Sequence, residues 1–294
     1  MLSLHTNSAA LSAQNAISMT QQSLSTSQTR LSTGFRINSS QDDAAGLQIA
    51  TRLKAETSGM AVAMRNTQNS ISMMQTADGA LQETTNILSR MKDLATQAAD
   101  GSSTATDQTA MQAEYDSLTS ELSNIVANTT FGGTSLLTDS TGKFAATTGI
   151  TFQIGASSAE TMTVNLSSQL SSMSTDLTAA AAEFNGSTGA ASTGGTELTG
   201  SGTANTTIAS LSSAIDAVST VRSALGAASN SLDHVYNNLS NISTNTTAAT
   251  GRLMDTDFAA ESSNMTSEQM LLQAGTAMLK QSNSTSSLVL SLLQ

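Results

Sequence analysis

Small and apolar residues recur every three or four positions along three stretches of the chain. The first stretch carries this seam at Met60, Met64, Thr67, Ile71, Met74, Ala77, Leu81, Thr84, Leu88, Met91, Ala95 and Ala98. Two further seams follow, at Met111, Tyr115, Leu118, Leu122 and Ile125, and then from Ile208 to Leu253. Spacings of three and four residues place side chains on one helix face, and a sustained heptad repeat is typical of coiled coils. The pattern therefore predicts three helices that pack together along these seams.

The first of these helices is predicted to run from Gln41 to Ala99. Ser40 and Asp43 have the spacing of a capping box at its start, and Gly101 supplies the chemistry of a helix end. At 1.5 Å per residue this helix would be about 88 Å long. A helix of that length needs partners along it, which the other two seams can supply.

Weaker apolar stripes occupy the two ends of the chain. The N-terminal stripe comprises Leu4, Leu11, Ile17, Leu24 and Leu31. The C-terminal stripe comprises Leu271, Met278, Leu288, Leu292 and Leu293, with Leu272 and Leu279 beside it. Neither stripe is apolar enough to hold a stable helix alone. We therefore expect the two to pack together as a terminal coiled coil.

The middle of the chain has a different period. Residues 150–155 and 161–166 alternate apolar and polar side chains around a polar turn, which predicts a β-hairpin within 144–166. Residues 171–205 are rich in Gly, Ser, Thr and Ala, which predicts a short, variable, surface-exposed region. One small helix is expected there, at 175–184.

The expected fold is mainly α: a long antiparallel helical coiled-coil rod with a small β-hairpin region and a short surface-exposed loop or knob. The two halves of the chain run in opposite directions, so both chain ends should fall at the same end of the rod. The expected domains are the terminal coiled coil of 1–41 with 253–294, a long-helix core of 42–170 with 206–252, and the surface region 171–205.

Composition narrows the possible functions. The 294 residues carry a net charge of −11 with only 11% charged residues, so the clustered cations that bind nucleic acid or an anionic membrane are lacking. The chain has no Cys, which excludes disulfides and thiol ligands. It also has no apolar run of about 18 residues and no sign of a cleavable secretory signal. We expect neither a nucleic-acid nor a membrane partner.

The residue types that usually carry chemistry point away from catalysis. His5 and His234 are the only histidines, and they lie far apart in the sequence. Asp42 with Asp43, and Asp255 with Asp257, stand at predicted helix starts, where an acidic side chain complements the helix dipole. We therefore predict no catalytic residue, no cofactor and no metal site.

Four motifs resemble segments of bacterial flagellins. TRLSTGFRINSSQDDAAGLQIATRLKAE (29–56) is similar to the N-terminal signature of that family, and NILSRMKDLATQAADG (86–101) is similar to its next block. The hairpin ITFQIGASSAETMTVNL (150–166) and the ending SNMTSEQMLLQAGTAMLKQSNSTSSLVLSLLQ (263–294) also resemble flagellin segments. The motifs occur in the order of the family, and the resemblance covers nearly everything except the surface region.

The resemblance implies a secreted, non-enzymatic structural subunit of the bacterial flagellum. Such a protein polymerises with copies of itself into the filament used for swimming, with the terminal coiled coil lining the central channel. The flagellar type III apparatus exports it, and an export chaperone covers its C-terminus. The flagellar cap protein and the hook-associated junction proteins are its further partners. Two alternatives stay open: a hook–filament junction protein and a type III-secreted coiled-coil effector.

Arg90, Leu94 and Glu114 carry the interface that the resemblance implies. The matching blocks of related flagellins face a neighbouring subunit in the filament, and the Toll-like flagellin receptor of animal hosts binds them in the free monomer. Arg90 can offer a guanidinium fork, Leu94 a small apolar contact and Glu114 a charged partner. The alternative is that all three residues only hold the filament together.

Overall fold

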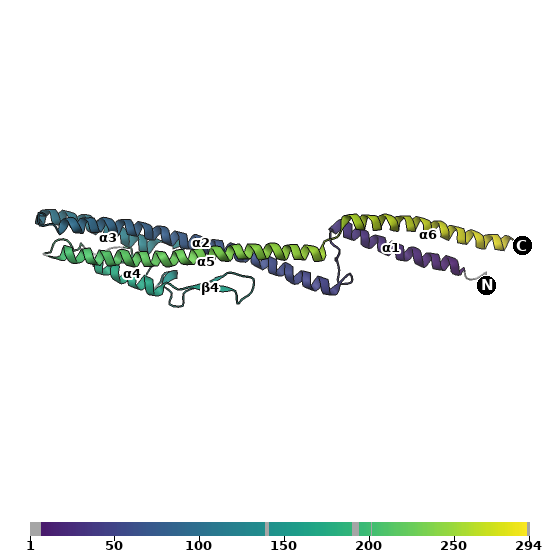
Figure 1. The fold of residues 1–294 in the computed structure, drawn as a ribbon, viewed down its shortest axis with the longest axis horizontal. Coiled ribbons are helices and arrows are strands. Elements are labelled where there is room, and N and C mark those ends of the chain that lie inside the picture. The colour runs from purple at the N-terminus through teal and green to yellow at the C-terminus, as the bar shows by residue number, and fades with distance from the viewer. Residues whose placement is uncertain (1–6, 139–140, 190–193, 201, 293–294) are drawn as a thin grey trace. The chain divides into compact units, whose positions relative to one another are not determined.

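The computed structural model describes residues 7–138, 141–189, 194–200 and 202–292, and it is predominantly helical (Figure 1). For residues 286–292 it gives the backbone only. Its α-helices are α1 (Ser8–Thr33), α2 (Ala44–Ala98), α3 (Ala105–Asn128), α4 (Ser167–Ala180), α5 (Thr203–Met254) and α6 (Phe258–Leu292). Its short elements are β1 (Thr130–Phe131), β2 (Thr134–Ser135), the 3-10 turn η1 (Lys143–Ala145), β3 (Ile150–Gln153) and β4 (Thr161–Val164). The mainly α fold with a small hairpin region is confirmed.

The chain divides into two compact units. One comprises Met1–Thr57 with Thr244–Gln294, and the other comprises Ser58–Ser243. Helices α2 and α5 contribute residues to both units. The expected limits of the terminal domain, at residues 41 and 253, therefore do not coincide with this division. The terminal coiled coil as a separate domain stays a prediction.

The core of the unit Ser58–Ser243 lies along the predicted seams. Side chains of α2, α3, α4 and α5 form one buried apolar cluster. In α2 every predicted seam residue except Met64 is buried. Helix α5 contributes Leu211, Val218, Val221, Leu225 and Leu232 to the same cluster. The helical seams predicted from the spacing of apolar residues are therefore confirmed in this unit.

Threonine takes two of the buried seam positions of α2. The Thr67 hydroxyl donates to the carbonyl oxygen of Ala63 at 2.9 Å, and the Thr84 hydroxyl donates to that of Ala80 at 3.0 Å. A buried hydroxyl without a partner would cost about 1–3 kcal/mol, and these bonds to the preceding turn remove that cost. Threonine therefore packs in the seam as a small side chain.

Helix α2 begins later than predicted, and Asp43 caps it instead of Ser40. The Oδ1 atom of Asp43 accepts a hydrogen bond from the backbone N–H of Gly46 at 2.8 Å. The residues before Asp43 form a turn, because the Asp42 carboxylate accepts from the backbone N–H of Ser39 at 2.8 Å. The predicted capping box is therefore wrong. The Asp42 carboxylate closes the turn before the helix, and the Asp43 carboxylate caps the first turn of the helix.

The predicted hairpin is confirmed, and a smaller one accompanies it. Strands β3 and β4 pair antiparallel, with Ile150 opposite Val164. Strands β1 and β2 have two residues each, too few to show a period in the sequence. Their turn holds Gly132 and Gly133, both with positive φ. A Gly-Gly pair is a known signal for such a tight hairpin turn.

The region 171–205 is more ordered than its composition predicts. The small helix expected at 175–184 is instead α4, which begins at Ser167 and ends at Ala180. The apolar side chains that anchor α4 and the residues after it to the core are Leu170, Met173, Leu177, Phe184 and Leu198. The described part of the region is therefore partly packed against the unit through these apolar side chains.

The Tyr115 hydroxyl provides a test of this packing. It donates to the carbonyl oxygen of Ala180 at 2.7 Å, and Tyr115 is fully buried. Tyr115→Phe leaves that carbonyl without its partner and should lower the free energy of unfolding by about 1–3 kcal/mol. The matched change Tyr236→Phe, at a side chain 37% exposed, should alter it by less than about 0.5 kcal/mol. Urea unfolding followed by circular dichroism measures both, and equal midpoints would contradict the role given to this bond.

Candidate functional site

We define the joint as residues 34–43, between α1 and α2, together with residues 255–257, between α5 and α6. Backbone hydrogen bonds hold its two segments together: the Arg36 N–H donates to the last carbonyl of α5 at 2.6 Å, and the Thr256 N–H donates to the Gly34 carbonyl at 3.0 Å. Gly34 ends α1 with φ 76°, a left-handed conformation that favours glycine. The joint therefore connects the terminal helices to the long ones through two paired segments.

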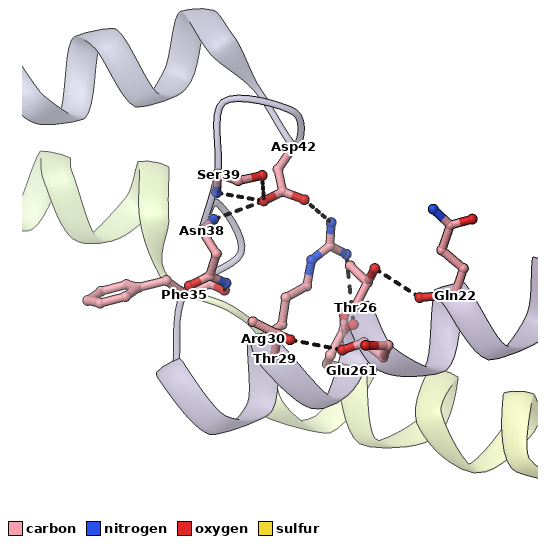
Figure 2. A network of polar contacts seen from close by, with 10 residues as sticks. Gln22, Thr26, Thr29, Arg30, Phe35, Asn38, Ser39, Asp42 and Glu261 are labelled. Carbon is pink, nitrogen blue, oxygen red and sulfur yellow. Dashed lines mark hydrogen bonds and ion pairs between the residues drawn. The ribbon is translucent and has the colours of Figure 1, made fainter.

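Arg30 ties the joint to both terminal helices (Figure 2). Its guanidinium lies 3.9 Å from the Asp42 carboxylate and 3.8 Å from the Glu261 carboxylate. The backbone N–H of Ser39, then that of Asn38, and more weakly the Arg30 charge lower the pKa of Asp42. Asp42 therefore stays ionised over a wide pH range and holds the turn against the arginine. Asp42 and Asp43 thus accept hydrogen bonds from backbone N–H groups near the start of α2, as the sequence predicts for acidic residues at a helix start.

Helices α1 and α6 pack as an antiparallel pair (Figure 1). At one end, the Asn7 side-chain amide donates to the Ser282 carbonyl oxygen at 3.3 Å. At the other end, Arg30 lies against Glu261. Among the described side chains of the two helices, only Ser27 and Glu261 are buried. The pair is therefore formed as the sequence predicts, but its packing is shallow.

The predicted packing residues of the terminal helices fall into three groups. Half-buried in the pair are Ile17, Leu24 and Leu31 of α1, and Leu272 and Leu279 of α6. Three others are exposed: Leu11 to 57%, Leu271 to 60% and Met278 to 66%. Leu4 and Leu293 lie outside the described residues, and the side chains of Leu288 and Leu292 are not described. The packing of the three exposed residues and of the four whose side chains are not described therefore stays a prediction.

Further methionines add to the apolar surface of this pair. Met19 on α1 is 71% exposed and Met270 on α6 is 59% exposed. Large apolar side chains exposed to more than half on one pair of helices make this pair a candidate surface for another molecule. We call Leu11, Met19, Met270, Leu271 and Met278 the exposed apolar set. Methionine suits such a surface, because its flexible thioether adapts to irregular partners.

The sequence-predicted interface residues on α2 and α3 lie in two different environments. Arg90 donates from Nε and Nη2 to the same Glu114 oxygen, Oε1, at 2.9 and 2.7 Å. These two side chains are 55% and 47% exposed, so both remain accessible to a partner. Leu94 is only 2% exposed and belongs to the core cluster. Its helix face packs inside the chain, and its expected role as an apolar contact for another protein stays a prediction.

The arrangement defines a class of protein. Long helices with a shallow terminal pair and exposed apolar side chains are typical of structural proteins that associate with other chains through helix faces. No helix in the described part of the chain has both the length and the apolar character that crossing a membrane requires.

Comparison with known proteins then gives the family. The model of the bacterial flagellin N-terminal helical region matches residues 4–141, and the model of the C-terminal helical region matches residues 208–293. Flagellin A of Vibrio anguillarum is 33% identical over 383 aligned positions that cover 100% of both chains. The chain belongs to the bacterial flagellin family, whose members are structural subunits of the flagellar filament.

Other relatives match over part of their length. Polar flagellin F of Vibrio parahaemolyticus is 47% identical over 167 residues, which cover 57% of this chain and 43% of that protein. B-type flagellin of Pseudomonas aeruginosa is 47% identical over 165 residues, which cover 56% of this chain and 33% of that protein. The chain thus spans less than half the length of these two relatives. The crystal structure of Bacillus cereus flagellin matches with 35% identity and a TM-score of 0.47, covering 63% of this chain and 94% of that chain.

Asp42 provides a test of the joint. Asp42→Ala removes the acceptor for two backbone N–H groups and one partner of Arg30. We expect faster hydrogen exchange at Asn38 and Ser39, and a free energy of unfolding lower by about 1 kcal/mol, as for a lost helix cap. Exchange measured by NMR on the full chain reports both, with Asp93→Ala on α2 as the control. Unchanged exchange at Ser39 would mean that Asp42 does not hold the turn.

Proposed function

We propose that this chain is a subunit of an extracellular flagellar filament and polymerises with copies of itself. Its membership of the flagellin family supports this function. The observation that carries the proposal is the shallow α1–α6 pair, which leaves the exposed apolar set in water. Covering one Leu or Met side chain contributes about 1.5–3 kcal/mol, so neighbouring copies that cover this set gain several kcal/mol each.

The form of the polymer follows from the kind of contact. When one surface of a subunit binds a different surface of the next, and the rotation does not close a ring, an open helical filament results. The α1–α6 pair exposes apolar side chains on both of its helices, so each copy can contact more than one neighbour. We propose that the terminal pair forms the inner layer of the filament, where such contacts are most numerous.

The same reasoning extends to the partners that handle the chain before assembly. We propose export by the flagellar type III apparatus, with a chaperone that covers α6 and the residues after it until export. The exposed Met270, Leu271 and Met278 favour such a partner, since they would otherwise promote aggregation. Contacts with the cap protein and the hook-associated junction proteins belong to the same proposal. The matched relatives are themselves flagellins, which favours this function over a junction protein or a type III-secreted effector.

Recognition by the Toll-like flagellin receptor is a further part of the proposal. The accessible groups are the Arg90 guanidinium and the Glu114 carboxylate, which lie together on the α2–α3 surface. Because Leu94 is buried, the recognised surface must use the charged pair and its exposed neighbours. A filament neighbour and the receptor would then compete for one surface.

Polymerisation tests the exposed apolar set directly. The double variant Leu271→Gln with Met278→Gln should leave the monomer's helix content unchanged, because both side chains are exposed in the chain. Its critical concentration for polymerisation should rise at least tenfold, since each tenfold corresponds to about 1.4 kcal/mol. Sedimentation and electron microscopy of seeded, purified protein measure this. Gln273→Ala on the same helix should polymerise normally, and normal filaments from the double variant would rule out this interface.

Receptor signalling tests the α2–α3 surface separately. The double variant Arg90→Ala with Glu114→Ala should weaken signalling in cells that carry the receptor, while the monomer loses no more than about 1 kcal/mol of stability, as for an exposed ion pair. Glu121→Ala, an exposed carboxylate on α3, is the control. If signalling by the double variant equals that of the control, Arg90 and Glu114 serve packing alone.

A further inference from the structure

Three carboxylates from distant parts of the sequence meet in the unit Ser58–Ser243. Asp116 lies on α3, and Glu183 and Glu197 lie between α4 and α5. One oxygen from each carboxylate lies within 4.8 Å of the other two. The connecting segment 181–202 contains no Lys or Arg, and none of the ion pairs in the described part of the chain includes these residues. We call the three residues the carboxylate cluster.

Hydrogen bonds from neighbouring residues fix two members of the cluster. The Gln112 side-chain amide donates to Asp116 Oδ1 at 2.8 Å and to Glu197 Oε2 at 2.9 Å. The backbone N–H of Gly195 donates to Asp116 Oδ1 at 3.2 Å, and that of Ala182 donates to Glu197 Oε1 at 3.0 Å. Gln112 is itself held, because its Oε1 accepts from the Leu198 N–H. The cluster is therefore positioned by a partly buried network and does not consist of loose surface side chains.

Glu183 has no such support. It is 9% exposed, and its Oε2 has no hydrogen-bond partner among the described residues. A buried carboxylate without a partner is costly, and it needs either a proton or a cation. The Glu183 carboxylate lies beside the Asp116 and Glu197 carboxylates, and no cationic side chain among the described residues pairs with the three.

We propose that Asp116, Glu183 and Glu197 bind a calcium ion. An all-oxygen donor set suits a hard cation, and Ca²⁺ accepts carboxylates at about 2.3–2.6 Å in flexible geometry. One oxygen from each carboxylate lies within 4.8 Å of the other two, a separation that a single Ca²⁺ ion can span. The flexible coordination of Ca²⁺ also suits three unevenly placed ligands better than the near-ideal octahedron that Mg²⁺ demands. Water molecules complete its coordination.

The bound ion would fasten α3 to the segment that precedes α5. Asp116 comes from α3, whereas Glu183 and Glu197 bracket most of the connection between α4 and α5. Sites with few protein ligands in extracellular proteins bind calcium with dissociation constants of about 10⁻⁴–10⁻³ M. This affinity suits a chain that binds calcium only after it leaves the cell. The inference does not depend on filament assembly, because all three ligands belong to one copy.

Calcium titration of the full-length monomer tests the proposal. After treatment with EDTA and dialysis, isothermal titration calorimetry with CaCl₂ should show one site per chain with a submillimolar to millimolar dissociation constant. Thermal unfolding should shift upward by a few degrees in 5 mM CaCl₂ relative to NaCl of the same ionic strength, since a ligand that binds only the folded state stabilises it by about 1 kcal/mol at five times its dissociation constant. MgCl₂ should have a smaller effect.

Two variants assign the effect to the cluster. Glu183→Gln keeps the shape of the side chain and should weaken calcium binding at least tenfold, and Asp116→Asn should do the same from the opposite side of the cluster. Glu121→Gln, an exposed carboxylate on α3, removes the same charge and should bind calcium as the unaltered chain does. Calcium binding that survives in both cluster variants would overturn the proposal. The absence of any calcium effect on the unaltered chain would also overturn it. If Glu183→Gln were then as stable as the unaltered chain, a shared proton would take the place of the ion.

Discussion

A long helix with one narrow apolar stripe is stable in water only while another helix covers that stripe. Everything else in this structure depends on how fully the condition is met. Between residues 58 and 243 the stripe of α2 is covered by α3, α4 and α5, and its members are nearly all buried. In the α1–α6 pair the cover is incomplete, and several apolar side chains remain exposed. Helix pairing thus buries the apolar stripes almost completely in one unit and leaves apolar side chains exposed in the other.

The unusual composition follows from the same seams. A seam where helices approach closely needs small side chains, and the chain uses Ala, Ser and Thr for many of them. The cost of burying a hydroxyl is avoided because it donates to a carbonyl oxygen of the preceding turn, as Thr119 does to Tyr115 and Ser123 does to Thr119. A helix can therefore be rich in Ser and Thr and still have a dry, well-packed face. Few charges and few aromatic residues are needed in such a core.

The sequence predicts the features that repeat, and it does not predict those that depend on single contacts. The seams and the main hairpin follow from periods of three to four and of two residues, and both are confirmed. Helix α4 is predicted too late in the sequence, because its buried leucines begin directly after the hairpin, within a stretch dominated by small residues. The burial of Leu94 is not predicted, because a family motif identifies a residue type and not which way its helix face turns. The carboxylate cluster is invisible in the sequence, since only the fold brings its members together.

The exposed side chains of α6 show how one helix can serve two partners. Leu271 and Leu272 are adjacent, as are Met278 and Leu279, and each pair repeats after seven residues. Adjacent residues on a helix point about 100° apart, so the two heptad stripes form neighbouring faces. Leu272 and Leu279 are half-buried, whereas Leu271 and Met278 are exposed. In this chain α1 covers one of these faces, and under the proposed function another copy covers the second. The weak packing of the terminal pair would then serve assembly, because a pair that buried both faces internally would leave nothing for its neighbours to bind.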